Sequence, residues 1–202
     1  MIATILILIF LLVYLIGYLW YIRIIYKKEI IKPWFIYFSM LLLFPILIIN
    51  SNILSAFFIE NISYFRNLWI WFGLLGILLL VSGVRMMQLA KRALTKSKVM
   101  YSTERIFKTM RFPHYSALFL MYNGLAILCD SVFGIFFIPI FIILLEIIVS
   151  IEEKKVLLKR YKGSYENYIR KTPSKLFPNP YNYLLIIVTI ITFYVGFLNL
   201  FL

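Results

Sequence analysis

Residues 113–149 read PHYSALFLMYNGLAILCDSVFGIFFIPIFIILLEIIV and give the clearest indication of fold class in this chain. Two apolar runs, 113–129 and 131–149, flank a short turn at Asp130-Ser131. A helix needs about twenty mainly apolar residues to cross the hydrocarbon core of a bilayer, and both runs approach that length. The stretch therefore predicts an antiparallel hairpin of two membrane-spanning helices.

The rest of the chain extends this pattern. Of its 202 residues 63% are hydrophobic, whereas a soluble domain carries roughly 45–50%, so the excess indicates contact with lipid. Six stretches have the length and composition of spans, and they are residues 2–22, 33–50, 68–90, 113–129, 131–149 and 183–202. Residues 51–66 are expected to form a loop or a partly inserted segment. We predict an all-α integral membrane protein of about six transmembrane helices, a single membrane domain over residues 1–202.

The basic residues support this topology. Segments 23–32, 85–111 and 152–175 hold four, eight and eight basic residues, while 51–67 holds one and the turn at 130–131 holds none. Such alternation is expected for six spans with both termini outside, because basic loops remain in the cytoplasm. We assign the net charge of +13 to these loops and to lipid head groups, and not to nucleic acid.

Residues able to carry chemistry gather where the predicted hairpin opens toward the basic side. Arg111-Phe112-Pro113-His114-Tyr115 enters the fourth span, and His114 is the only histidine of the chain. A proline in the first turn and an arginine beside it also have purely structural explanations. Histidine transfers protons near neutral pH, so His114 is a candidate catalyst. With one histidine and one cysteine, the chain lacks the usual ligands of a zinc or haem site, and we predict no metal.

A second group follows the fifth span. Glu152 and Glu153 lie among basic residues, where they can pair with a nearby lysine or arginine on a solvated helix or serve a site. Glu146 lies deeper in the apolar run and needs a partner. Beyond the acids, apolar and aromatic residues recur at helical spacing, namely Val156, Leu157, Tyr161, Tyr165 and Tyr168. They predict an amphipathic helix on the membrane surface or over the end of the bundle.

The order of these residues resembles the isoprenylcysteine carboxyl methyltransferase superfamily, which includes phospholipid N-methyltransferases. The shared elements are an Arg-x-Pro-x-Tyr helix entry, a Glu-Glu pair about forty residues later and a tyrosine segment that closes on proline. They correspond here to Arg111, Pro113, Tyr115, Glu152, Glu153, Tyr165, Tyr168 and Pro173. The resemblance covers residues 80–178. The chain departs from the family at Phe112, where the family has histidine, and at Arg105, where it has glycine.

The resemblance implies S-adenosylmethionine as cofactor, at the cytoplasmic mouth of the helices at 113–129 and 131–149. It implies methyl transfer to a lipid-like or prenylated acceptor, a carboxylate or an amine, reached from the bilayer. Arg111 would bind the cofactor carboxylate, and Glu152 or Glu153 its ammonium group. The other implied binding residues are Pro113, Tyr115, Tyr165 and Tyr168, whose tyrosines offer aromatic faces to adenine or the sulfonium. The catalytic candidates are Arg111, His114 and Glu153.

Two other functions fit part of the pattern. Membrane reductases of the steroid and sterol type share an Arg-x-Pro-x-Tyr entry and use NADPH. They usually have asparagine before the tyrosine and Gly-Glu shortly after it, where this chain has His114 and Ala117-Leu118, which favours the methyltransferase. A non-enzymatic membrane protein that kept the fold is the third possibility, and Phe112 and Arg105 favour it. Cofactor binding distinguishes the enzymes from the non-enzyme.

Overall fold

The computed structural model describes residues 13, 16–17, 20, 68–96 and 105–201. In these residues the chain is helical and contains no strand, which confirms the all-α prediction for this part. The elements are α4 (Trp69–Lys96), the short 3-10 helix η3 (Arg105–Lys108), α5 (Pro113–Leu128), α6 (Val132–Glu152), the π-helix η4 (Glu153–Leu157), α7 (Leu158–Lys171) and α8 (Tyr181–Phe201). The predicted span 33–50 and loop 51–66 lie outside the described residues, as does span 2–22 except for residues 13, 16, 17 and 20.

The hairpin has the boundaries that its turn residues specify. Pro113 opens α5 at the first helical position, where its missing N–H costs nothing. Ser131 caps α6, because its side-chain oxygen accepts a hydrogen bond from the Gly134 amide at 3.1 Å. At its other end, α6 does not stop near residue 149 as expected but continues through Glu152 into η4 and α7. The acids predicted to follow the span therefore lie within a continuous helical segment.

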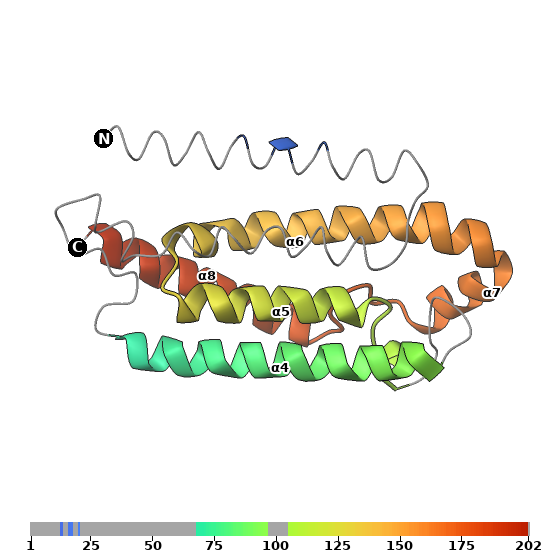
Figure 1. Ribbon diagram of the computed structural model, residues 1–202, viewed down its shortest axis with the longest axis horizontal. Coiled ribbons are helices and arrows are strands. Elements are labelled where there is room, and N and C mark those ends of the chain that lie inside the picture. The colour runs from blue at the N-terminus through green and yellow to red at the C-terminus, as the bar shows by residue number, and fades with distance from the viewer. Residues whose placement is uncertain (1–12, 14–15, 18–19, 21–67, 97–104, 202) are drawn as a thin grey trace.

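Helices α4, α5 and α6 run lengthwise through the molecule, with α5 between the other two (Figure 1). Glycines let α4 and α5 approach closely. A Cβ atom at Gly124 of α5 would lie 2.7 Å from the Gly76 carbonyl oxygen, and one at Gly83 of α4 would lie 2.9 Å from the Ala117 carbonyl oxygen. Small residues at a crossing are typical of helix pairs in membranes, where close backbone approach provides much of the packing energy.

The core lies between α5, α6 and α7 and is largely aromatic. Tyr122 of α5 packs on Phe141 of α6 with ring centroids 4.5 Å apart, and Phe119 stacks on the same Phe141 at 6.2 Å. Tyr165 of α7 is fully buried against the same core. This packing attaches α7 firmly to the end of the hairpin, so the side chains there have fixed positions.

Helix α7 covers the end of the bundle at which α5 begins and α6 ends (Figure 1). Leu157, Tyr165 and Tyr168 are buried, and Val156 and Tyr161 are half-buried. The amphipathic face predicted from the sequence is thus the face that packs on the core. Helical geometry breaks once within α7, at Lys162, whose φ of 38° is unusual for a residue with a side chain.

The outward faces of α4 and α8 are apolar. Their exposed side chains include Ile70, Trp71, Leu74, Ile77 and Leu78 on α4, and Leu184, Ile187, Ile190 and Ile191 on α8. Among the described residues one helix, Ile70–Thr95, is long and apolar enough to cross a membrane, and the apolar stretch Tyr181–Tyr194 is shorter. The remaining spans stay a prediction.

Candidate active site

The linker between α7 and α8, residues 172–180, is held against the entry of α5 by backbone hydrogen bonds. The amide of Arg111 donates to the carbonyl of Ser174, and the amide of Phe112 donates to the carbonyl of Lys175, both at 3.0 Å. One turn further, the Ser116 hydroxyl donates to the Leu176 carbonyl at 2.6 Å. Two segments about sixty residues apart in sequence thus become neighbours, and their side chains share one end of the bundle.

Arg111 and Glu153 form a buried ion pair at this end. Arg111 Nη1 lies 2.6 Å from Glu153 Oε1, and the two side chains are only 6% and 9% exposed. Arg111 Nη2 also donates to the carbonyl of Pro173 at 3.2 Å, and the Tyr165 hydroxyl donates to Glu153 Oε1 at 3.3 Å. The pair therefore joins the entry of α5, the end of α6, the body of α7 and the linker.

The neighbouring acid is buried as well, with a partner of its own. The Tyr115 hydroxyl donates to Glu152 Oε2 at 2.7 Å. Consecutive residues of an α-helix point about 100° apart, so two adjacent buried acids are unusual. Glu152 ends α6 and Glu153 begins η4, whose wider turn is closed by the Leu158 amide on the Glu153 carbonyl. The sequence left the choice between the two acids open. In the structure both acids lie in one buried cluster with Arg111, Tyr115 and Tyr165, and Glu153 is the acid that pairs with Arg111.

The cluster alters the acidity of its members. Burial raises the pKa of Glu152 to about 7, and the hydrogen bond from Tyr115 offsets part of that rise. Burial also raises the pKa of Tyr165, and the adjacent Glu153 carboxylate raises it further. At neutral pH Glu152 thus holds a proton part of the time, while Tyr165 stays a hydrogen-bond donor.

The other predicted site residues lie at the edge of this cluster. The ring of His114 packs on Tyr115 with centroids 4.3 Å apart, and the side chain is 8% exposed. Pro113 serves as the first residue of α5. Tyr168 packs on Tyr165 at 5.6 Å and donates its hydroxyl to the Phe107 carbonyl at 2.8 Å. In this structure Tyr168 thus fastens α7 to the segment before α5.

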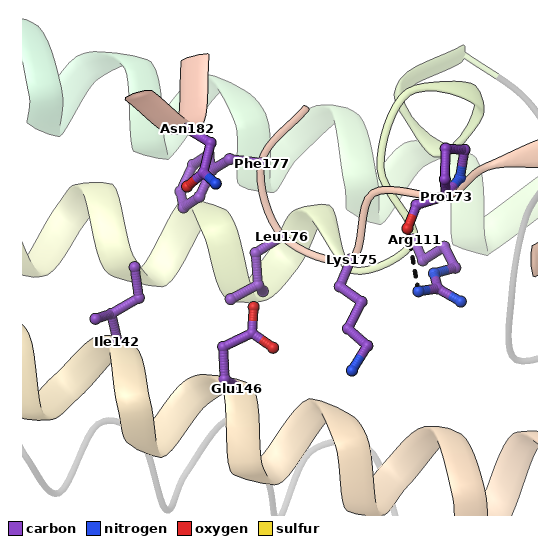
Figure 2. Close-up of a pocket in the computed structure, with 8 residues that line it drawn as sticks. All are labelled: Arg111, Ile142, Glu146, Pro173, Lys175, Leu176, Phe177 and Asn182. Carbon is purple, nitrogen blue, oxygen red and sulfur yellow. Dashed lines mark hydrogen bonds between the residues drawn. The ribbon is translucent and has the colours of Figure 1, made fainter. Parts of the chain in front are cut away.

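A cleft of about 280 Å³ opens beside the cluster, between α6 and the linker (Figure 2). Its lining residues are Arg111, Ile142, Glu146, Pro173, Lys175, Leu176, Phe177 and Asn182. Figure 2 shows Glu146 extending from α6 toward the linker and Lys175 extending from the linker toward α6. The ammonium of Lys175 donates to the Ser150 hydroxyl at 2.9 Å. The cleft therefore contains an acidic side chain, Glu146, and basic side chains, Arg111 and Lys175, beside the apolar residues of its lining.

Sequence reasoning found part of this cleft. Glu146 stood out as an acid inside an apolar run, and Arg111 stood out in the helix entry motif. Lys175 and Asn182 were missed, because a lysine in a basic segment and an asparagine at a helix start carry no local signal of a site. Only the pairing of the linker with the entry of α5 brings them to the cleft.

The buried donors of Arg111 are not all used within the described part of the chain. Its Nε atom is buried and has no hydrogen-bond partner there, although the same side chain lines the cleft. A buried N–H without an acceptor is costly. In comparisons with protein-family models, curated proteins and solved structures, nothing matches this chain.

Proposed function

We propose that this chain is an integral membrane methyltransferase, similar to isoprenylcysteine carboxyl methyltransferases, that uses S-adenosylmethionine. One observation carries the proposal. The residues that the sequence shares with that family lie in three separate segments, and five of them meet in one buried cluster, namely Arg111, Tyr115, Glu152, Glu153 and Tyr165. A resemblance that arose from chance spacing alone would not be expected to bring these residues together in this way.

The proposal includes six membrane spans with both termini outside. The apolar outward faces of α4 and α8 support it, as does the length of Ile70–Thr95. The entry of α5 and the end of α6, which carry the cluster, lie at the end of the bundle where the described basic residues of 91–96, 105–111 and 152–175 gather, and the positive-inside rule assigns such segments to the cytoplasm. A lipid-like or prenylated acceptor would then reach the site from the bilayer.

The cleft suits the amino-acid end of the cofactor. That end carries a carboxylate, which Lys175 and Arg111 at the cleft can bind, and an ammonium group, which Glu146 can bind. Glu153 is already paired with Arg111, so in this proposal Glu146 takes the role that the family resemblance implies for Glu152 or Glu153. The volume of about 280 Å³ is just below the roughly 300–1,000 Å³ of whole-ligand pockets, which fits one part of the cofactor.

When bound, the cofactor supplies an electrophilic methyl group on a sulfonium. The chain itself contributes mainly position, because an in-line displacement is accelerated by alignment in a dry site. A carboxylate acceptor needs no base. An amine acceptor must lose a proton, and the pKa of Glu152, at about 7, suits that transfer. His114, packed on Tyr115, remains the second candidate for it.

Binding of S-adenosylhomocysteine to the detergent-purified chain tests the proposal. We expect micromolar affinity by calorimetry, and Glu146→Gln and Lys175→Met should each weaken it at least tenfold. Both side chains lie at the cleft and outside the buried core, so the variants should have the same unfolding temperature as the parent protein. Lys171→Met, which removes an exposed lysine elsewhere, is the control. Equal affinities in all four proteins would contradict the assignment of the cleft.

A non-enzymatic role is the second candidate, and the pairing of the cluster's charged side chains with one another favours it. Arg111 and Glu153 satisfy one another in a buried pair, which is also what a purely structural network requires. Such a protein would bind neither S-adenosylhomocysteine nor NADPH while folding normally. Binding of NADPH alone would instead assign the chain to the membrane reductases.

A further inference from the structure

A second hollow, of about 380 Å³, lies along α6 and η4. The described residues of its lining form two rows with a spacing of four residues, Glu146, Ser150 and Lys154 in one row and Ile147, Ile151 and Lys155 in the other. Residues four apart lie on the same face of a helix, so this groove follows the helix axis. It contains no member of the buried cluster, and it shares only Glu146 with the cleft.

One end of the groove is cationic. Lys154 and Lys155 are both exposed, and within the described ranges neither has an ion-pair or hydrogen-bond partner. The ammonium of Lys175 lies close by, since it donates to the Ser150 hydroxyl. Two free lysines on adjacent positions provide charge-assisted donors for an anion. In the part of the chain that the structure describes, no acid pairs with them at this end.

The other end of the groove is apolar. Ile147 is 51% exposed and Ile151 is half-buried, and Ile143, 58% exposed, continues the same face toward the middle of α6. Glu146 lies about 12 Å from Lys154 along the axis, at the helical rise of about 1.5 Å per residue. Its carboxylate is directed toward the linker across the cleft (Figure 2). At that separation it opposes an anion at the lysines only weakly.

The order of chemistry along the groove is therefore ammonium groups, a hydroxyl and then isoleucines, with Glu146 beside Ile147 and directed toward the linker. A phospholipid in one leaflet presents a phosphate, a glycerol and acyl chains in the same order. We propose that the groove binds one phospholipid, with its phosphate at Lys154 and Lys155 and an acyl chain along Ile151, Ile147 and Ile143. The site shares Glu146 with the cleft proposed for the cofactor, and it rests on the proposed membrane topology and not on methyl transfer.

Titration of the detergent-purified full chain with dioleoylphosphatidylglycerol, followed by native mass spectrometry, tests this site. We expect one tightly bound lipid per chain, and Lys154→Gln with Lys155→Gln should weaken it at least tenfold. Lys91→Gln with Lys171→Gln removes the same charge from exposed positions elsewhere and should change the affinity less than twofold. Equal losses in the two double variants would overturn the proposal, because they would indicate attraction by net charge alone.

Two further measurements separate a lipid site from a phosphate site. Inorganic phosphate at millimolar concentration should not displace the lipid, and Ile147→Asn should weaken lipid binding at least threefold while leaving the unfolding temperature unchanged. Displacement by phosphate, or full affinity in Ile147→Asn, would overturn the assignment of the apolar half of the groove to an acyl chain.

Discussion

Arg111 is the residue on which the cluster depends, because its guanidinium is the cation that faces the buried carboxylate of Glu153. We expect Arg111→Ala to lower the free energy of unfolding by about 3–5 kcal/mol, the usual cost of leaving a buried charge unpaired. Arg111→Met with Glu153→Leu removes both charges and should recover most of that loss. Denaturant unfolding in detergent measures the free energy of unfolding of Arg111→Met and Glu153→Leu, singly and together. If the double variant loses as much stability as the two single variants combined, the two side chains do not stabilise each other.

Glu152 gives the same cluster a pH response. Its pKa is raised from 4.5 to about 7 by burial, so the folded chain holds this proton over a range in which the unfolded chain has released it. The contribution to stability is complete below about pH 4.5 and is lost as the pH rises through about 7. Relative to Glu152→Gln, the parent should lose up to about 1.4 kcal/mol per pH unit in that window.

Thermal unfolding of the parent and Glu152→Gln from pH 5 to pH 8 checks this response. The amide of the variant can still accept the hydrogen bond from Tyr115, so the two proteins differ chiefly in the titration. A difference between their melting temperatures that stays constant with pH would show that Glu152 does not titrate there.

At the scale of elements, the crossing of α4 and α5 depends on glycine. A Cβ atom at Gly124 would lie 2.7 Å from the Gly76 carbonyl oxygen and 2.7 Å from the Leu80 amide nitrogen. These are backbone atoms, which cannot move aside without separating the helices. We expect Gly124→Ala to destabilise the chain by about 1–3 kcal/mol.

Gly73, on the same helix α4, supplies the matched control. A Cβ atom there meets no atom of the described residues within 4 Å, and alanine favours a helix over glycine by up to about 1 kcal/mol. Gly73→Ala should therefore be neutral or stabilising in the same unfolding experiment. If both alanine variants behave alike, close backbone approach is not what holds the two helices together.

The sequence predicted the elements whose ends are marked by local chemistry. Proline and serine commonly begin helices, so Pro113 and Ser131 located the starts of the two hairpin helices to within a residue or two. The end of α6 could not, because no breaker follows residue 149 and the turn at η4 has no sequence signature. The cleft depends on Arg111 and Lys175 meeting across some sixty residues, and hydrophobic periodicity carries no information about such pairings.

For the whole molecule, the single cysteine reports the topology. Cys129 is exposed at the turn between α5 and α6, which lies outside in the proposed topology. A membrane-impermeant maleimide should label it in intact cells. In Cys129→Ser with Glu166→Cys, on the exposed face of α7, labelling should require permeabilised cells. Labelling of both positions from the same side would contradict the proposed arrangement.

The π-helix η4 has a further meaning for how this chain tolerates changes in length. A turn closed from residue 153 to residue 158 holds one residue more than an α-helical turn, so it acts as a single-residue insertion between α6 and α7. The wider turn absorbs that extra residue, so α7 keeps nearly the rotation that an uninterrupted α-helix one residue shorter would give it. Deleting one residue of η4 would return the turn to α-helical width and leave Tyr165 facing the core, whereas inserting a further residue would turn α7 by about 100° and carry Tyr165 away from Glu153. This segment thus tolerates the loss of a residue better than the gain of one.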